Sequence, residues 1–287
     1  MKFRTIFILF NVILVVSFGF MFVMPFALLG TGYTMSFWAS NWPLGAFFLA
    51  VLAAFNAFFI ANWQMFTLVE KEDWTTLETW LRVRLFDRGR TDRRYVRLFI
   101  NVCLLRGDME SIAQLEARLA EKQPAALRRD AVLFAAARLL ANDPAKSEAF
   151  LAPYLDGKGV DHAPWLRFYH AFSLVLLQRA DEAAPALESN LGARDPVLAA
   201  LSAYLLGSLS AAASAPERRD ALVAAAGKAR DALLAGMDAA RWSKETERAR
   251  GEVHIVIMSK LIDEAGAWLY PGSVAERAAG TPTPAKA

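Results

Sequence analysis

The sequence lacks the residue patterns on which most enzymes and metal proteins depend. Its single cysteine, Cys103, rules out an intrachain disulfide and is typical of a reducing compartment. There is no HExxH, no Cys-His spacing for zinc, and no Gly-rich phosphate loop ending in Gly-Lys-Ser or Gly-Lys-Thr. We therefore expect no enzyme, cofactor, bound metal or small-molecule substrate.

Acidic residues are missing from the first 69 positions, where the only charged residues are Lys2 and Arg4. Residues 70–287 hold all 29 acidic residues and 30 of the 32 lysines and arginines, which leaves them a net charge of +1. With so small an excess, the pI of about 9.0 is weak evidence for binding nucleic acid. We expect no nucleic-acid partner.

Two long uncharged runs occupy the N-terminal part of the chain, at residues 5–30 and 43–69. A membrane-spanning helix needs about 20 apolar residues, because hydrocarbon offers no water to exposed backbone groups. Both runs are long enough to span. A cleaved signal peptide is the alternative for the first run, but signal peptides have apolar cores of about 7–15 residues followed by a small-residue cleavage site. The first run is longer and has no clear site of that kind.

Basic residues flank the two runs. Lys2 and Arg4 precede the first, five basic residues between 71 and 90 follow the second, and the intervening residues 31–42 are uncharged. Positive flanks favour the cytoplasmic side of a membrane. We therefore predict a hairpin in the cytoplasmic (inner) membrane of a bacterium, with both termini cytoplasmic.

Four polar residues lie in or near the runs: Asn11, Asn56, Asn62 and Gln64. They can line a polar path for a substrate. Alternatively they have a structural role, either in hydrogen bonds between helices worth about 0.6–2 kcal/mol each or by lying near the membrane interface. Neither run contains an ionisable residue, so nothing favours a proton or ion pathway. We favour the structural role.

Residues 73–86 have the 3.6-residue periodicity of an amphipathic helix, and seven arginines lie between 82 and 97. Such a helix can lie on the bilayer, with tryptophans at the headgroups and arginines on anionic lipid. It can equally be the first helix of the domain that follows, with the arginines on a solvated face. The residues predicted for membrane-surface contact are Trp74, Trp80, Arg82, Arg84, Arg88 and Arg90.

Polar breaks recur at regular intervals after residue 92, between apolar segments of helical periodicity. They read LLRGD at 104–108, LLAND at 139–143 and LLQRAD at 176–181, and their aspartates are 35 and 38 residues apart. Such periods are typical of stacked helical hairpins. The Arg-Gly-Asp tripeptide at 106–108 is also a known type of adhesion ligand, but the breaks recur without it. We therefore predict a turn, in which Gly107 reverses the chain and Asp108 caps the next helix.

Residues 107–124 combine a Gly-Asp turn, an amphipathic helix and a closing proline, and they resemble the second half of a tetratricopeptide repeat (TPR). Residues 179–196 have the same length without the glycine, and 142–155 form a shorter version. The resemblance extends over about residues 92–196. It implies a right-handed superhelix of hairpins whose concave face binds peptides or partner proteins. The family's aromatic and glycine positions in the first helix are not kept, so no ligand-binding residue carries over.

Further helices are predicted at 196–213, 216–237 and 244–270, the first two of which begin at proline. Residues 271–287 are rich in proline, glycine and alanine and predict a disordered tail. The predicted fold is all-α. It comprises a transmembrane helical hairpin at 1–69, a juxtamembrane amphipathic helix at 70–91, a TPR-like α-solenoid at 92–270 and the tail.

Several side chains outside the repeats bear on possible sites. The three histidines form no metal-binding pattern and are interpreted as structural or solvated, although His162 and His170 share one segment. The charges at 245–250 are interpreted as a solvated face, and the DGKG at 156–159 as a loop. Trp165, Phe168 and Tyr169 are the best candidates for an aromatic anchor of a partner protein, with core packing as the default alternative.

These features together predict a membrane-anchored scaffold or adaptor that recruits or organises partner proteins at the cytoplasmic face of the membrane. Anchoring raises the local concentration of binding sites and strengthens otherwise modest peptide contacts. The alternative is a structural subunit of a membrane-embedded complex, in envelope assembly, secretion or motility, whose transmembrane helices make the main contacts.

Overall fold

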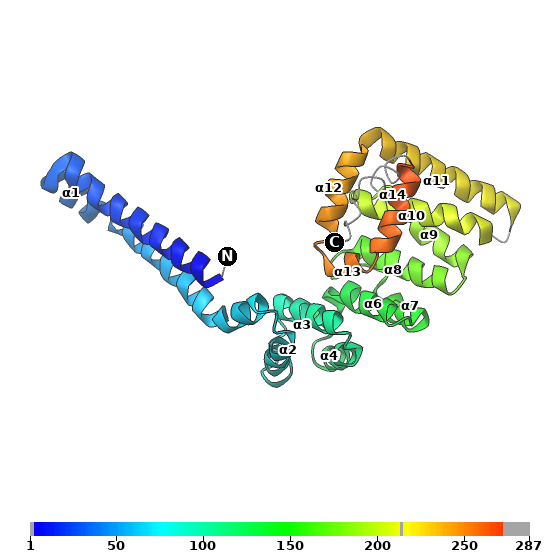
Figure 1. Ribbon diagram of the computed structural model, residues 1–287, viewed down its shortest axis with the longest axis horizontal. Coiled ribbons are helices and arrows are strands. Elements are labelled where there is room, and N and C mark those ends of the chain that lie inside the picture. The colour runs from blue at the N-terminus through cyan, green and yellow to red at the C-terminus, as the bar shows by residue number, and fades with distance from the viewer. Residues whose placement is uncertain (1–2, 213–214, 272–287) are drawn as a thin grey trace, which may run out of the picture. The chain divides into compact units, whose positions relative to one another are not determined.

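A computed structural model describes residues 3–212 and 215–271, so the predicted tail from 272 onward lies outside the described residues. All regular elements in these ranges are helices, which confirms the all-α prediction (Figure 1). The chain divides into two compact units, one ending at Arg84 and the other beginning at Leu85.

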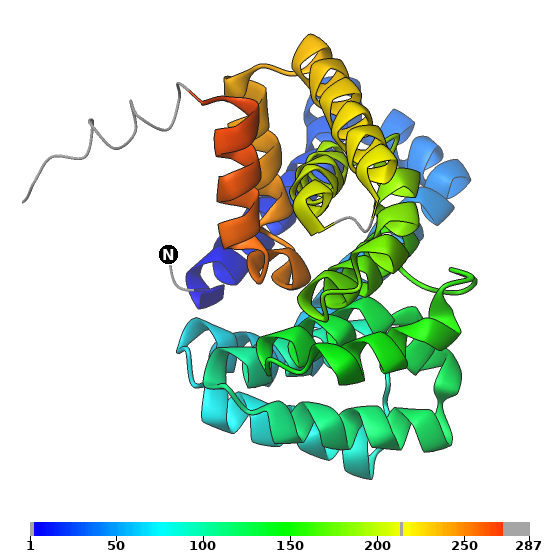
Figure 2. The same cartoon turned by 90° about the vertical axis from the view of Figure 1, so that its right-hand side faces the viewer.

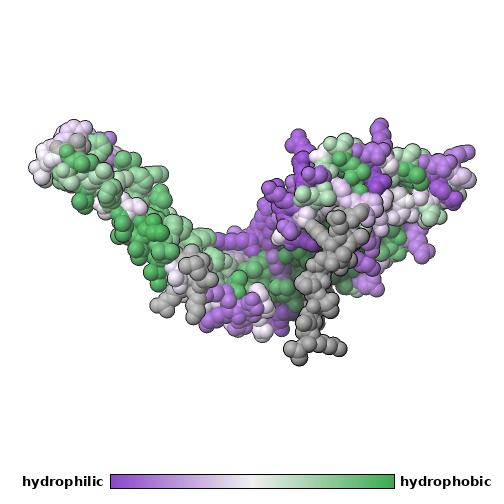
Figure 3. Space-filling model, turned by 45° about the horizontal axis from the view of Figure 1, so that its top comes forward, coloured by the Kyte–Doolittle hydropathy of each residue, from purple (hydrophilic) through white to green (hydrophobic). Residues whose placement is uncertain are grey.

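The first unit begins with a helical hairpin. α1 (Phe3–Glu70) has non-helical backbone angles at Gly30 and Asn41, so it consists of two long helices joined by a short helical segment. Phe7–Leu28 and Gly30–Glu70 are long and apolar enough to cross a membrane, as the sequence predicted. Figure 3 shows hydrophobic residues covering much of the surface of this hairpin.

Aromatic side chains hold the two long helices of α1 antiparallel. The ring centroids of Phe10 and Phe55 lie 4.5 Å apart, and those of Phe18 and Phe48 lie 5.3 Å apart. Such pairs contribute about 0.5–1.5 kcal/mol beyond the area they bury. Gly45 allows a close approach at this interface, because a Cβ atom there would lie 3.3 Å from the ring of Phe22.

The asparagines of α1 bond within their own helices. The side-chain amides of Asn11 and Asn56 each donate to the carbonyl four residues earlier, at 2.9 and 3.0 Å, and Asn62 makes the same bond at 2.7 Å. For the amides of Asn11 and Asn56 the expected hydrogen bonds between helices are therefore wrong. A carbonyl four residues back lies within reach of a short amide side chain in any helix, so this bond needs no neighbouring helix.

α2 (Trp74–Arg82) folds back on the end of α1. The indole Nε1–H of Trp80 donates to Oε1 of Gln64 at 2.9 Å, and the guanidinium of Arg84 lies 3.9 Å from the centre of the Trp80 ring. Leu77 and Leu81 are fully buried, as the amphipathic pattern predicted. The helix thus has an apolar face that is already covered. Residues Val83–Asp87 then form a short π-helical turn, η1.

The same backbone turn occurs four times along the chain. Its left-handed residue has a φ of 54° at Glu72, 71° at Gly107, 56° at Asn142 and 61° at Gln178, at intervals of 35, 35 and 36 residues. At each turn the next residue donates its N–H to the carbonyl five positions earlier, which is the Schellman form of a helix C-terminus. The first of these turns therefore lies at the end of α1, one repeat before the first turn predicted from the sequence.

Aspartate caps the helix after three of these turns. Asp73, Asp108 and Asp143 accept N–H bonds of 3.0–3.1 Å from the residue three positions on. The Arg-Gly-Asp tripeptide is thus a turn between helices, as predicted. In the fourth turn Arg179 takes the capping position and Asp181 lies inside the first turn of the helix. The expected equivalence of Asp181 with Asp108 is therefore wrong, because the left-handed residue sets the register.

The second unit is a series of antiparallel hairpins (Figures 1 and 2). α10 lies at its centre, where Leu198, Leu201 and Leu206 are fully buried, and it contacts α9, α11 and α14. The helices of the series are α3 (Arg93–Arg106), α4 (Met109–Lys122), α5 (Pro124–Arg129), α6 (Ala131–Leu140), α7 (Pro144–Leu151), α8 (Ala163–Leu176), α9 (Ala180–Asn190), α10 (Pro196–Leu209) and α11 (Pro216–Gly236), with the short 3-10 turns η2 (Ala152–Tyr154) and η3 (Ser210–Ala212).

Three helices then return across the series: α12 (Ala239–Ala249), α13 (Val253–Val256) and α14 (Ser259–Leu269). The single helix predicted at 244–270 is therefore wrong. The chain turns at 250–252 and again at 257–258, so that α13 contacts α6 while α12 and α14 contact α10. The phenolic O–H of Tyr169 donates to the carbonyl of His254, and that of Tyr270 to the carbonyl of Met237 at 2.6 Å. The returning helices are thereby fixed to the hairpins.

Candidate partner-binding pocket

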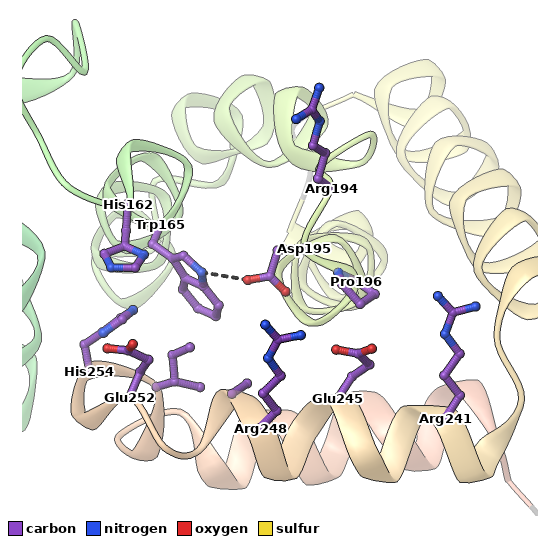
Figure 4. Close-up of a pocket in the computed structure, with 12 residues that line it drawn as sticks. His162, Trp165, Arg194, Asp195, Pro196, Arg241, Glu245, Arg248, Glu252 and His254 are labelled. Atoms are coloured by element: carbon purple, nitrogen blue, oxygen red, sulfur yellow. Dashed lines mark hydrogen bonds between the residues drawn. The ribbon is translucent and has the colours of Figure 1, made fainter. Parts of the chain in front are cut away.

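A cavity of about 540 Å³ opens where α12 and α13 pass the N-terminal end of α10. Figure 4 shows its two walls. α12 contributes a row of charged side chains, and the beginnings of α8 and α10 form the opposite wall. The volume falls in the range of about 300–1,000 Å³ that is common for ligand sites.

The wall opposite α12 is built around Asp195. One carboxylate oxygen accepts the indole Nε1–H of Trp165 at 2.9 Å, and the other accepts the backbone N–H groups of Val197 and Leu198 at 3.0 and 3.3 Å. Asp195 thus caps α10, and Pro196 occupies the first helical position. These bonds occupy both carboxylate oxygens and fix this wall in place.

Charged residues of alternating sign line α12 and the turn after it. Arg241, Glu245, Arg248 and Glu252 follow at intervals of four, three and four residues, which places them on one stripe. Figure 4 shows the side chains of the two arginines and Glu245 directed from α12 toward the beginning of α10. Of the charges interpreted as a solvated face, Glu247 and Arg248 are exposed, as predicted, and Arg248 also lines the cavity. Glu245 is only half-exposed, because α12 packs with Trp242 and Thr246 inward and directs Glu245 into the cavity.

One end of the cavity holds two histidines that are far apart in the sequence. The rings of His162 and His254 lie 5.3 Å apart, and Trp165 contacts His254 edge to face at 5.5 Å. His254 is 2% exposed, and its Nε2 has no hydrogen-bond partner in the described chain. Burial, followed by the nearby His162 and Arg97, lowers the pKa of His254 to about 3, so its ring is neutral at physiological pH.

Arg97 organises the charges behind this end of the cavity. Its guanidinium lies 3.4 Å from Nε2 of His162 and 3.7–3.9 Å from carboxylate oxygens of Asp130, Asp161 and Glu252. These residues come from α3, from the start of α6, from the loop before α8 and from the start of α13. His162 itself has a φ of 58°, an uncommon conformation for a residue with a side chain.

The predicted aromatic anchor is corrected by the structure. Trp165, Phe168 and Tyr169 are 4%, 0% and 0% exposed, because α8 packs between its neighbouring helices and these side chains face the core. Only Trp165 reaches the cavity wall. The default alternative of core packing therefore holds for all three residues.

The other predicted residues lie away from the cavity. Trp74, Trp80, Arg82 and Arg84 belong to the first unit, while Arg88 and Arg90 are exposed near the start of the second. Cys103 is fully buried. His170 lies 3.7 Å from Glu148, and residues 156–159 form a loop before α8, as predicted. Groups of three or more potential metal ligands are absent from the residues that the structure describes.

Sequence comparison finds relatives of the chain among proteins of the genus Treponema. A family described as "Uncharacterised Treponema protein" matches residues 111–271. A protein from Treponema pallidum (strain Nichols), described as "Uncharacterized protein", is 29% identical over 260 residues, which cover 85% of this chain and 83% of the relative. No solved structure matches the chain significantly. The family match includes both walls of the cavity.

Proposed function

The chain belongs to the family described as "Uncharacterised Treponema protein", and within it we propose that the protein is a membrane-anchored adaptor or scaffold that recruits or organises partner proteins. The observation that carries the proposal is the cavity of about 540 Å³ on a helical domain whose chain continues from two helices of membrane-spanning length. Stacked helical hairpins commonly present extended surfaces to partner proteins.

Anchoring is what would make modest contacts effective. A site held at a membrane meets other membrane proteins at a high local concentration, so each contact need supply little affinity by itself. We place the anchor in the cytoplasmic membrane with both termini in the cytoplasm, because basic residues flank the hairpin and its connecting segment is uncharged. Arg88 and Arg90 are exposed and are proposed to contact anionic lipid headgroups.

Co-purification from native membranes tests the adaptor function. The full-length protein, carrying an affinity tag, is extracted in mild detergent after crosslinking in cells. We expect a reproducible set of partners with the wild-type chain and their loss with Glu245→Trp, which places an indole in the cavity. Glu247→Trp is the matched control, because Glu247 lies on the same helix, is exposed and does not line the cavity.

The same experiment separates the adaptor from a structural subunit. If the partners persist in Glu245→Trp but are lost in Asn11→Leu or Asn56→Leu, the spans make the main contacts and the adaptor proposal fails. Loss of partners in both Glu245→Trp and its control Glu247→Trp would indicate damage to α12 itself. Circular dichroism of each purified variant checks that its helices remain intact.

A further inference from the structure

The charges in the cavity that lack partners are mostly positive. Asp195 is occupied by Trp165 and by the start of α10, and Glu252 lies 3.9 Å from Arg97. Arg194, Arg241 and Arg248 form no ion pair with any residue in 3–212 or 215–271, and the guanidinium of Arg241 donates within those ranges only to the carbonyl of Gly236, at 3.0 Å. Glu245 and Asp195, whose partners are neutral N–H groups, also form no ion pair within those ranges, so three arginines without an ion pair face two such acidic residues.

The two arginines of α12 are too far apart to share one small anion. Seven residues separate Arg241 from Arg248, and at about 1.5 Å per residue their backbones lie roughly 10 Å apart along the helix. Glu245 lies between them and repels an anion at the centre. A ligand that satisfies both arginines therefore carries two negative groups about 10 Å apart, with no negative charge between them.

An extended peptide meets this requirement. In the polyproline II conformation the chain rises about 3.1 Å per residue with three residues per turn, so residues three apart lie on one face at roughly 9 Å. Two acidic side chains separated by two residues thus match the spacing of Arg241 and Arg248. A helix about 10 Å wide is a poor match for a cavity of about 540 Å³ that is partly enclosed by α8, α10 and α13.

The buried imidazole of His254, at the end of the cavity, has a ring nitrogen without a hydrogen-bond partner in the described chain. His254 is 2% exposed, lines the cavity and has an Nε2 atom without a hydrogen bond in the described chain. Figure 4 shows its ring between His162 and Glu252, at the end of the charged row. An unsatisfied buried polar atom requires a partner such as water or a ligand. A backbone amide or a small polar side chain of a bound peptide would supply one.

We propose that this cavity binds an extended acidic segment of a partner protein, in which two acidic residues separated by two others pair with Arg241 and Arg248. The inference rests on the proposed adaptor function for its source of ligand, and it adds the chemical class of that ligand. Arg194, on the opposite wall, contributes positive potential at the mouth.

Fluorescence anisotropy with labelled peptides tests the proposal on the full-length protein in nanodiscs of neutral lipid. The first probe is a proline-rich peptide of eight residues that contains Glu-Pro-Pro-Glu and has no other charged side chain. The second has the same composition with the glutamates adjacent, and the third has lysines in place of the glutamates. Inorganic phosphate is added as a competitor. We expect the first probe to bind at least about fivefold more tightly than the second, the lysine probe not to bind, and phosphate to compete poorly.

Charge reversals on α12 supply the matched variants. Arg248→Glu and Arg241→Glu are each expected to weaken binding of the first probe about tenfold or more, and Arg248→Gln by less. Lys244→Glu makes the same change in charge on the same helix but away from the cavity, and it should leave binding unchanged. Arg241, Lys244 and Arg248 are all exposed, and circular dichroism verifies the fold of each variant.

Three results would overturn the proposal, and a fourth would contradict only the adaptor function. Equal binding of the first two probes would mean attraction to charge without a spacing requirement. Equal weakening by Lys244→Glu, or no anisotropy change with millimolar protein, would exclude this site. Partners retained in cells while the acidic probe fails would leave the adaptor function standing without this ligand. A probe that binds as expected while no partner co-purifies would contradict the adaptor function but not the chemistry of the cavity.

Discussion

Trp165 and Asp195 join the beginnings of two helices through one hydrogen bond of 2.9 Å between the indole Nε1–H and a carboxylate oxygen. Trp165 lies in the first turn of α8, and Asp195 is the cap of α10. The bond therefore sets the distance between two neighbouring helices of the array, and it does so at the wall of the cavity. Its loss would affect both the capped helix and the shape of the pocket.

Replacing Asp195 by alanine is expected to destabilise the start of α10. The change removes the cap, at about 0.5–2 kcal/mol, and leaves the buried indole N–H of Trp165 unsatisfied, at about 1–3 kcal/mol. Hydrogen exchange of the α10 amides, followed by mass spectrometry, should show this as faster local exchange. Asp195→Asn should have a smaller effect, because an asparagine oxygen can still cap. Asp231→Ala on the exposed face of α11 is the control, and an equal effect there would contradict the prediction.

The left-handed turn residues predict a pair of opposite changes in stability. Gly107 has a φ of 71° with no neighbouring atom within 4 Å of an added Cβ, so Gly107→Ala should lower the free energy of unfolding by about 1 kcal/mol through backbone strain alone. Gln178 has a φ of 61° at the equivalent position, and Gln178→Gly should raise it by about 0.5–1 kcal/mol. Thermal unfolding of both variants checks the signs. A less stable Gln178→Gly protein would show that its side chain matters more than its backbone.

Gly266 is predicted to be a site where a single methyl group is not tolerated. A Cβ there would lie 2.8 Å from Nε1 of Trp242, so Gly266→Ala must displace the indole that packs α12 against α14. Overpacking of this kind costs about 1–3 kcal/mol. Gly227 in the middle of α11 has nothing within 4 Å, and Gly227→Ala should instead stabilise by up to about 1 kcal/mol. Chemical denaturation of the two variants gives the comparison.

Acid should destabilise the domain through His254. The folded-state pKa of about 3 lies below the ordinary value of 6.5, so the unfolded chain takes up the proton first as the pH falls. The stabilisation is fully present above about pH 6.5 and is lost progressively between pH 6.5 and 3, by about 1.4 kcal/mol per pH unit. Burial also lowers the pKa of His170, which acts in the same direction.

Denaturant midpoints measured between pH 7 and 4.5 test this dependence. His254→Phe removes the titrating group, so the free energy of unfolding should depend less on pH over that range. Between pH 7 and pH 4.5 the variant should lose about 2–3 kcal/mol less than the wild type. An unchanged slope would mean that His254 is more accessible to water than its burial indicates.

The proposed topology predicts the reactivity of an introduced thiol. Lys260 has a side chain that is 92% exposed, and the native Cys103 is fully buried. A Lys260→Cys protein should react with a membrane-impermeant maleimide only after the cells are lysed. Labelling in intact cells would place the helical domain on the other side of the membrane and would contradict a cytoplasmic adaptor.

The all-α fold, the apolar hairpin and the turn at Gly107 could be predicted from the sequence because each depends on local chemistry. Uncharged runs, a Gly-Asp pair and a period near 35 residues act within one or two helices. The turn at Glu72 was not predicted, because neither Lys71 nor Glu72 is a residue type that commonly adopts a positive φ. The signal available was Asp73, which stands 35 residues before Asp108.

The cavity could not be predicted, because its walls come from segments far apart in the sequence. His162 meets His254 only because the chain turns twice after α12, and those turns carry no strong breaker other than Gly251. Glu245 and Arg248 look like surface charges in a sequence of mixed sign. The aromatic cluster at Trp165, Phe168 and Tyr169 was a candidate binding site for a similar reason. From sequence alone, aromatic residues packed in a core cannot be distinguished from aromatic residues that line a groove.

The turn at Glu72 also determines where the chain can be shortened. Gln64, near the end of α1, accepts the hydrogen bond from Trp80, and α2 buries Leu77 and Leu81 in the same unit. A form beginning at residue 70, the natural choice from hydropathy alone, would keep α2 while removing the helix on which it folds back. In that form Trp80 would lose the hydrogen bond to Gln64. A soluble form for crystallisation should instead begin at Leu85, where the second unit starts.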